Sequence, residues 1–453
     1  MTSLWFETAL LPDGWASDVR LEVREGKIAA VERDQPLTPD DEHHGVAAPG
    51  LCNLHSHAFQ RAMAGLTEYR GASADDFWSW REWMYRFLDR IGPDDVEAIA
   101  AQAYVEMLQT GFTRVGEFHY LHNDIDGAAY ADPAEMATRI AAAAADTGIG
   151  LTLLPVFYAH GGFGGAPPTG GQRRFVTSLD GFERLVEASR RAVASLPDAN
   201  LGVAPHSLRA VTPQELTGLV ALSPTGPLHI HAAEQVREVA DCLAWSGQPP
   251  VAWLLDHQAV DARWCLVHAT HLTTDEISRL ATSGAVAGLC PITEANLGDG
   301  VFPADRYLAL GGAFGLGTDS NVLIDPAQEL RALEYGQRLS RLARNVLASP
   351  DRPSTGANLF LGALKGGARA LGQQTFGLTV GASADIVCLN RHHPSLYARS
   401  GDTLLDAWIF AGTPGIVTTV WRRGQKMVRH GRHCDAEPIA DRYRRTIEKL
   451  IAL

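Results

Sequence analysis

The alternation of short apolar segments with amphipathic ones between residues 49 and 374 constrains the fold most. The amphipathic stretches, among them 94–109, 134–146, 181–195 and 326–347, have the apolar spacing of helices. Eight units of buried strand and helix predict a (β/α)₈ barrel of the TIM type, whose functional groups lie at the C-terminal ends of the strands. The predicted strands cover residues 51–55, 113–119, 151–158, 201–207, 228–232, 265–269, 285–290 and 314–319.

Short alternating segments return on both sides of this region. They lie at 19–23 and 27–31 before it, and at 384–389, 417–421 and 424–428 after it. We therefore expect the chain ends, 1–48 and 375–453, to build one small β-sandwich domain together, with the barrel at 49–374 between them. A helix over 439–450 is expected to close the chain.

Composition excludes several classes of protein. The formal net charge of −13 argues against nucleic-acid binding, and local arginines would have to offset it for an anionic substrate. No secretory signal pattern opens the chain and no stretch is apolar enough to span a bilayer, so we expect a soluble cytoplasmic protein. The six cysteines are scattered without a C-x-x-C pair, which argues against a disulfide framework or a thiolate zinc site.

Two histidines follow the first predicted strand. Residues 51–60 read LCNLHSHAFQ and place His55 and His57 two positions apart. Because side chains alternate along a strand, both imidazoles can face one metal ion. An isolated His-x-His pair is more often a surface or hydrogen-bonded pair, so the prediction depends on what later strands supply.

Later strands supply further polar residues at their ends. Strand five reads HIHAAE, in which His231 lies nearer the C-terminal end than His229, a predicted core residue, and Glu234 follows. Strand six ends in His268 and strand eight in Asp319. One such residue is usually only a polar cap. The two imidazoles of strand one, His231 of strand five and Asp319 of strand eight together form the open nitrogen and oxygen ligand set of a catalytic zinc or iron ion. The histidines without such support are treated as incidental: His43, His44, His122, His160 and His271.

The order H-x-H, H-x-x-E, H and T-D resembles the amidohydrolase superfamily over nearly the whole chain. Binuclear members usually bridge two metal ions with a carboxylated lysine on strand four. Here strand four reads LGVAPHSL, and no lysine lies between Lys27 and Lys365. The chain therefore resembles the mononuclear deaminase branch of that superfamily.

Longer motifs narrow the resemblance. PGLCNLHSHAFQRAMAGLTE, FWSWREWMY, GEFHYLHND and APHSLRAV are similar to the iminohydrolases of histidine degradation that convert N-formimino-L-glutamate and water to N-formyl-L-glutamate and ammonia. The resemblance implies a homodimer with one zinc ion per subunit, although Fe²⁺ suits the same ligands. It implies His55, His57, His231 and Asp319 as metal ligands, Glu234, His268 and Asp319 as catalytic groups, and Gln60, Arg81, Tyr120, His206 and Arg209 as substrate-binding residues.

Elementary chemistry leads to the same roles. A metal-bound water loses its proton near neutral pH, and Asp319 can take that proton as the oxygen attacks the formimino carbon. Glu234 can pass a proton to the nitrogen while His268 stabilises the attacking oxygen. A dicarboxylate needs guanidinium groups, for which Arg209 and Arg81 are the candidates.

Several alternatives stay open. Arg81 lies among aromatic residues and could simply pair with a neighbouring glutamate. The substrate could be a nucleobase or another amidine, although arginines favour a carboxylate. A metal-free assembly scaffold would lack the ligands that this chain retains. The glycine-rich loop 161–171 suits a mobile lid better than a phosphate cradle.

Overall fold

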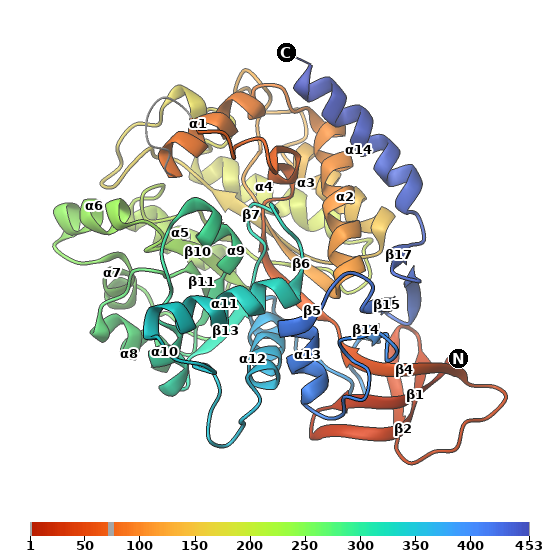
Figure 1. The fold of residues 1–453 in the computed structure, drawn as a ribbon. Helices are drawn as coiled ribbons and strands as arrows, with labels where there is room; N and C mark the ends of the chain where they lie inside the picture. Colours follow the sequence, from red (N-terminus) through yellow and green to blue (C-terminus); the bar gives the residue numbers. More distant parts are fainter. Residues whose placement is uncertain (1, 71–76, 453) are drawn as a thin grey trace.

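The computed structural model describes residues 2–70 and 77–452, and its larger part is a parallel barrel (Figure 1). The strand order is β10-β11-β12-β13-β5-β6-β7-β8, with β9 paired to β7. The predicted (β/α)₈ barrel is confirmed. Its strands are β5 (Leu51–Ser56), β6 (Phe112–His119), β7 (Gly150–Phe157), β8 (Asn200–Leu201), β9 (Ala204–Pro205), β10 (Leu228–Ala232), β11 (Trp264–His268), β12 (Val286–Leu289) and β13 (Ala313–Leu316).

The fourth barrel strand differs from the continuous strand predicted at 201–207. It is split into β8 and β9, because Val203 leaves the ladder of β7 and turns toward β10, whereas the amide of Gly202 still bonds the carbonyl oxygen of Leu153 at 3.0 Å. The amide of Val203 bonds the carbonyl oxygen of Pro227 at 3.0 Å, and single bridges join Val203 to Leu228 and Ser207 to His231. These bridges close the barrel between its fourth and fifth strands.

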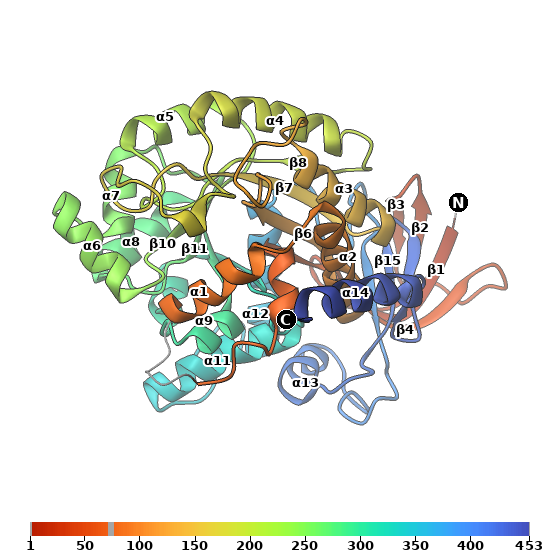
Figure 2. The same cartoon turned by 90° about the horizontal axis from the view of Figure 1, so that it is seen from above.

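Helices surround the strands, and Figure 2 shows several of them from above. Helix α12 packs closest, because a Cβ atom at its Gly366 would lie 1.7 Å from the carbonyl oxygen of Phe314. Helix α11 ends at Arg341, six residues before the predicted end, since Leu342 takes a left-handed conformation with φ of 52°. The helices around the barrel are α1 (Phe77–Leu88), α2 (Pro93–Thr110), α3 (Glu135–Thr147), α4 (Leu179–Val193), α5 (Pro213–Leu222), α6 (Val236–Ser246), α7 (Pro250–His257), α8 (Thr274–Ser283), α9 (Pro291–Leu297), α10 (Ala304–Ala309), α11 (Pro326–Arg341) and α12 (Thr355–Ala370).

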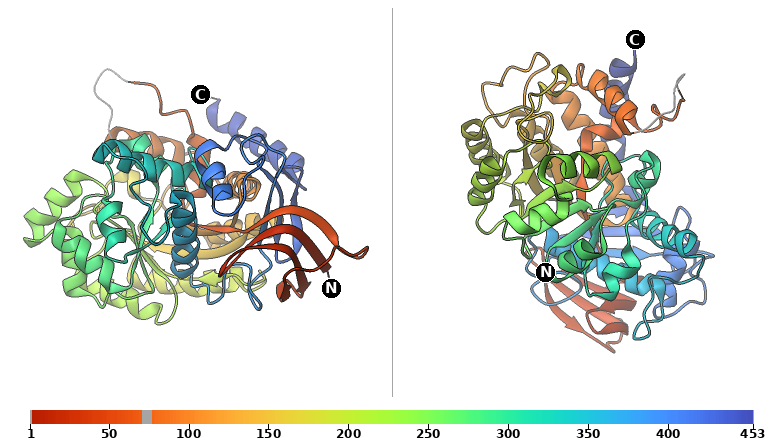
Figure 3. Two further views of the ribbon diagram at one scale, coloured as in Figure 1. Left: turned by 60° about the horizontal axis from the view of Figure 1, so that its bottom comes forward. Right: turned by 90° about the vertical axis from the view of Figure 1, so that its left-hand side faces the viewer.

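Both chain ends build a second sheet, which lies to one side of the barrel in Figure 3. Its order is β17-β16-β15-β14-β4-β1-β2-β3, and β14 pairs antiparallel with β4. The two halves thus join edge to edge in one continuous sheet, so both chain ends contribute to the same β structure, as predicted. The strands are β1 (Thr2–Leu11), β2 (Gly14–Arg24), β3 (Lys27–Glu32), β4 (Glu42–Pro49), β14 (Ile386–Leu389), β15 (Val417–Arg422), β16 (Gln425–Arg429) and β17 (Arg432–His433).

The last helices tie this sheet to the barrel. α13 (Thr403–Ala411) packs against α12, and α14 (Ala436–Ile451) lies along α2, where Lys449 Nζ is 2.7 Å from Asp95 Oδ2. α14 confirms the predicted closing helix. Among the described helices, none combines the length and the apolar character that a membrane crossing requires.

Candidate active site

Strand β5 presents two histidines to one point at the mouth of the barrel. β5 is buried along its whole length, with His55 near its end and His57 directly after it. Their Nε2 atoms are 3.2 Å apart. Nδ1 of His57 lies 2.9 Å from the carbonyl oxygen of Phe118, so Nδ1 carries the proton and Nε2 carries the lone pair.

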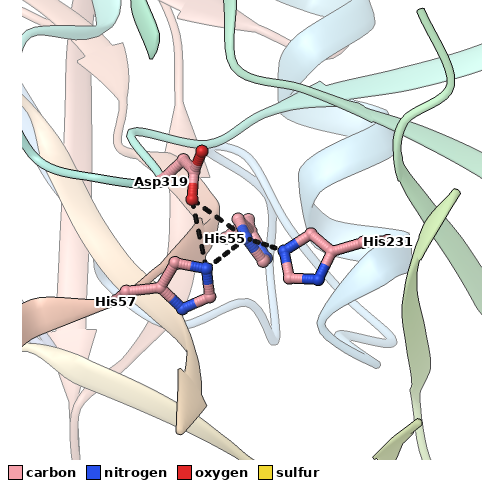
Figure 4. Close-up of side chains that lie close together, drawn as sticks. All are labelled: His55, His57, His231 and Asp319. Atoms are coloured by element: carbon pink, nitrogen blue, oxygen red, sulfur yellow. Dashed lines mark hydrogen bonds and ion pairs between the residues drawn. The ribbon is translucent and has the colours of Figure 1, made fainter. Parts of the chain in front are cut away.

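His231 and Asp319 bring two more ligand atoms to this point (Figure 4). Nε2 of His231, on β10, lies 3.1 Å from Nε2 of His55, while its Nδ1 lies 2.9 Å from the carbonyl oxygen of His206. Oδ1 of Asp319 lies 3.1 Å from His57 Nε2 and 3.4 Å from His55 Nε2. The four ligand atoms all lie within 4.8 Å of one another.

This group fits a divalent metal ion. Burial lowers the pKa of His55 to about 3, so its imidazole is neutral, which is the form that binds metals. The Nδ1 atoms of His57 and His231 are committed to backbone carbonyl oxygens, so their Nε2 lone pairs point at the same place. Converging lone pairs beside a buried carboxylate need a cation to offset their repulsion.

A network of buried amides holds the turn that carries Asp319. This residue has a φ of 45°, a left-handed conformation that costs energy for an aspartate. Nδ2 of Asn321 donates to the carbonyl oxygens of Asp319 and His57 at 3.1 and 3.2 Å. Oδ1 of Asn53 accepts the amide of Thr318 at 3.0 Å. Neither asparagine is among the predicted site residues, although Asn53 lies within the stretch LCNLHSHAFQ and Asn321 two positions after Asp319.

Glu234 and His268 lie beside the ligand group, as predicted. Nε2 of His268 is 3.7 Å from Glu234 Oε1 and 3.8 Å from Asp319 Oδ2. Its Nδ1 is 3.3 Å from Oε1 of Glu294, a buried residue on α9 that the sequence analysis did not single out.

The charges around His268 suit proton transfer. Burial alone would lower the pKa of His268, but the charge of Glu234 and the hydrogen bond to Glu294 raise it to about 10. Burial raises the pKa of Glu234 above its ordinary value. This buried pair therefore holds a proton more readily than the two groups do in water, which is typical of acid–base sites.

The predicted substrate-binding residues line the same pocket, whose volume is about 850 Å³. Gln60, on the short helix η1 (Ala58–Met63), donates from Nε2 to the hydroxyl of Tyr120 at 2.8 Å. The ring of His206 lies 4.8 Å from that of His231. Burial and the charge of Arg209 lower the pKa of His206 well below its ordinary value, so this imidazole is neutral.

The outer part of the pocket is cationic and aromatic. Arg209, with its Nε 3.4 Å from Ser207 Oγ, follows β9. Arg81 lies on α1, and its guanidinium carbon is 5.6 Å from the centre of the Tyr85 ring. Tyr85 and Tyr158 also line the pocket, and neither was predicted, since a tyrosine in an apolar segment is usually a core residue.

The remaining histidines lie elsewhere, in agreement with the sequence analysis. His229 is fully buried, with its Nε2 2.8 Å from the carbonyl oxygen of Ala370, so it is the predicted core residue. The histidines treated as incidental interact with backbone oxygens or acidic side chains: His43 with Glu7, His44 with Glu42, His122 with Val156, His160 with Glu215 and His271 with Asp299.

Most of the chain matches a known protein family. Residues 46–427 match the family described as "Amidohydrolase family". The chain belongs to the amidohydrolase family. Residues 1–45 of this amidohydrolase match the domain described as "Formimidoylglutamate deiminase HutF, N-terminal domain". The chain is therefore a hydrolase.

Individual relatives differ in the reactions for which they are named. A formimidoylglutamate deiminase from Pseudomonas aeruginosa is 50% identical to this amidohydrolase over 455 residues, which cover 100% of both chains. An 8-oxoguanine deaminase from the same organism is 28% identical over 390 residues, 81% of this chain and 80% of that protein.

Solved structures agree in fold. The crystal structure of an amidohydrolase from Brucella melitensis has a TM-score of 0.97 and 54% identity, and each chain is covered completely. An adenosine deaminase from Xanthomonas campestris with bound zinc has a TM-score of 0.83 at 23% identity, covering 100% of this chain and 99% of the other. The second similarity concerns the fold alone.

Proposed function

We propose that this amidohydrolase is a formimidoylglutamate deiminase, which hydrolyses the C–N bond of N-formimino-L-glutamate and releases N-formyl-L-glutamate and ammonia. One observation carries the proposal: a metal-ligand group and two arginines line a single pocket. The pocket therefore offers hydrolytic chemistry at one end and carboxylate recognition at the other. The relative with 50% identity over the whole chain carries this name.

The metal in this proposal is one zinc ion per subunit, held by the predicted ligands His55, His57, His231 and Asp319. Three imidazoles and one carboxylate leave room for a water molecule, as in catalytic zinc sites, and they also suit Fe²⁺. When bound, such an ion lowers the pKa of a water molecule so that it can act as a nucleophile at neutral pH.

The residues of the chain itself move the protons. Asp319 accepts the proton of the attacking water, since its Oδ2 faces away from the ligand point toward His268. Glu234, whose pKa is raised, carries a proton to the departing nitrogen. His268, whose pKa is raised by the charge of Glu234 and the hydrogen bond to Glu294, stabilises negative charge that develops on the attacking oxygen.

The substrate is bound through its two carboxylates. Arg81 and Arg209 supply guanidinium groups that match a carboxylate with paired hydrogen bonds. Gln60, Tyr120 and the neutral His206 line the same pocket, with the rings of Tyr120 and His206 beside those of His57 and His231, and they orient the formimino group. This local positive charge offsets the formal net charge of −13.

A nucleobase or another amidine is the second candidate substrate. The 28% identical relative is named as an 8-oxoguanine deaminase, which supports this candidate. A neutral base, however, carries no negative charge that could compensate the two arginines of the pocket.

We further propose that the enzyme is a cytoplasmic homodimer that acts in histidine degradation, and that loop 161–171 closes over the substrate. Its residues Gly161, Gly162, Phe163 and Thr169 line the pocket.

Ammonia release tests the proposal. The zinc-loaded protein is assayed with N-formimino-L-glutamate and with a panel of purines, pyrimidines and other formimino-amino acids. We expect fast release from formimino-glutamate alone. Turnover of a nucleobase alone would leave the metal chemistry in place but remove Arg81, Tyr120 and Arg209 from substrate binding.

A further inference from the structure

We propose that Tyr158 is a further specificity-determining residue, whose hydroxyl donates a hydrogen bond to a substrate carboxylate, and that Gln172 is the residue that positions this hydroxyl. The proposal rests on the proposed function and adds two residues to its carboxylate site. Tyr158 directly follows β7, and Gln172 ends the short helix η2 (Gly170–Gln172), just beyond loop 161–171.

Tyr158 lies where a carboxylate would be bound. It is 6% exposed and lines the pocket. Its ring lies 4.8 Å from that of His206 and 5.7 Å from that of Phe175. The charges of Arg209 and Arg81 both act on its hydroxyl. A ligand that contacts the two guanidinium groups is therefore within reach of the phenol.

Gln172 determines which way the phenol donates. Its Oε1 accepts the backbone amide of Thr169 at 2.7 Å, which fixes the orientation of its side-chain amide. Its Nε2 must then face Tyr158 and donates to the hydroxyl oxygen at 2.6 Å. The phenol oxygen serves as the acceptor in this bond, so its own proton is left to bond another group.

Among the residues that the structure describes, none accepts that proton, so a molecule that enters the pocket can accept it. A buried hydroxyl donor without an acceptor costs free energy, which a bound acceptor recovers. A carboxylate only accepts hydrogen bonds, and the nearby arginines compensate its charge. This hydroxyl therefore favours a carboxylate over a neutral amide or over a hydrogen-bond donor of a nucleobase.

The C-terminal end of the glycine-rich loop packs against the same wall of the pocket. A Cβ atom at Gly171 would lie 2.5 Å from the ring of Tyr85, so only glycine permits this close packing. The ring of Tyr85 in turn lies 6.2 Å from that of Phe175. The end of the loop thus acts on substrate selection through Gln172, whether or not the rest of the loop moves.

Two variants test the proposal in the zinc-loaded, full-length protein. Tyr158→Phe removes one oxygen atom and keeps the ring packed, and we expect KM for N-formimino-L-glutamate to rise about 10- to 100-fold with kcat changed less than about threefold. Gln172→Met should raise KM by a smaller factor and add little in the double variant, because both act through one hydroxyl. Tyr130→Phe is the matched control, since Tyr130 bonds Asp124 outside the pocket.

Substrates that lack one carboxylate separate recognition from a structural effect. Two analogues of formimino-glutamate are assayed, each lacking one of its two carboxylates. With the analogue that lacks the carboxylate bound by Tyr158, wild type and Tyr158→Phe should have the same kcat/KM. An unchanged KM for formimino-glutamate, or an equal loss with every substrate, would overturn the role of Tyr158. Absence of turnover by the wild type would instead overturn the proposed function and this inference with it.

Discussion

The two ends of the pocket are built in different ways. At the metal end the ligands come from the ends of β5 and β10 and from the turn after β13, where hydrogen bonds between strands hold the backbone. At the carboxylate end Arg81 comes from α1, Arg209 from the segment after β9 and Tyr158 from the end of β7, where Gln172 of η2 bonds its hydroxyl. Strand ends therefore hold the reacting groups, whereas the substrate is selected by strand-end residues together with segments outside the sheet. We expect substitutions at the two ends to act on different kinetic constants.

The largest effect is expected at the reacting end. Glu234→Gln keeps the shape of the side chain but removes its ability to give and take a proton, so kcat should fall by about 10²- to 10⁴-fold while KM and metal content change little. Steady-state kinetics and metal analysis measure this. Glu276→Gln is the control, since Glu276 is an equally buried carboxylate that caps α8 outside the pocket. Normal turnover in Glu234→Gln with metal bound would remove Glu234 from proton transfer.

The converse effect is expected at the carboxylate end. Arg209→Met should raise KM for the dicarboxylate by about 10²- to 10³-fold, because a charged hydrogen-bonded pair is lost, with a smaller change in kcat. Arg191→Met, which breaks an exposed ion pair with Glu187 on α4, should leave KM unchanged. If Arg209→Met lowered kcat and left KM alone, the division between the two ends would fail.

The same division explains what the sequence could predict. His55, His57, His231 and Asp319 were found because strand periodicity and position at a strand end are local signals. The bond between Gln172 and Tyr158 leaves no such signal, because it depends on how a loop returns to the sheet. The break in the fourth strand was missed for a related reason: bonds to Pro227 override the strand pattern there.

The support of the metal end gives a third, intermediate effect. Asn321→Ala removes bonds to the carbonyl oxygens of Asp319 and His57, so metal affinity should fall about 10- to 100-fold while the barrel stays folded. Competition with a chelator measures the affinity, and circular dichroism checks the fold. Asn345→Ala, on the surface after α11, is the control. Unchanged affinity would show that the strand ends alone position the ligands.

The smallest effect is expected at His122, a buried histidine outside the proposed metal site. Burial lowers the pKa of His122 from 6.5 to about 4, and its Nε2 bonds the carbonyl oxygen of Val156. As the pH falls below about 6.5, His122 becomes protonated in the unfolded chain but stays neutral in the native protein. The free energy of unfolding therefore decreases between about pH 6.5 and pH 4, by up to about 3 kcal/mol. In metal-depleted protein, His122→Gln keeps a donor for Val156 and should flatten this part of the pH profile of the unfolding free energy, measured by urea titration. Parallel profiles for both proteins would mean that the acid sensitivity arises from groups other than His122.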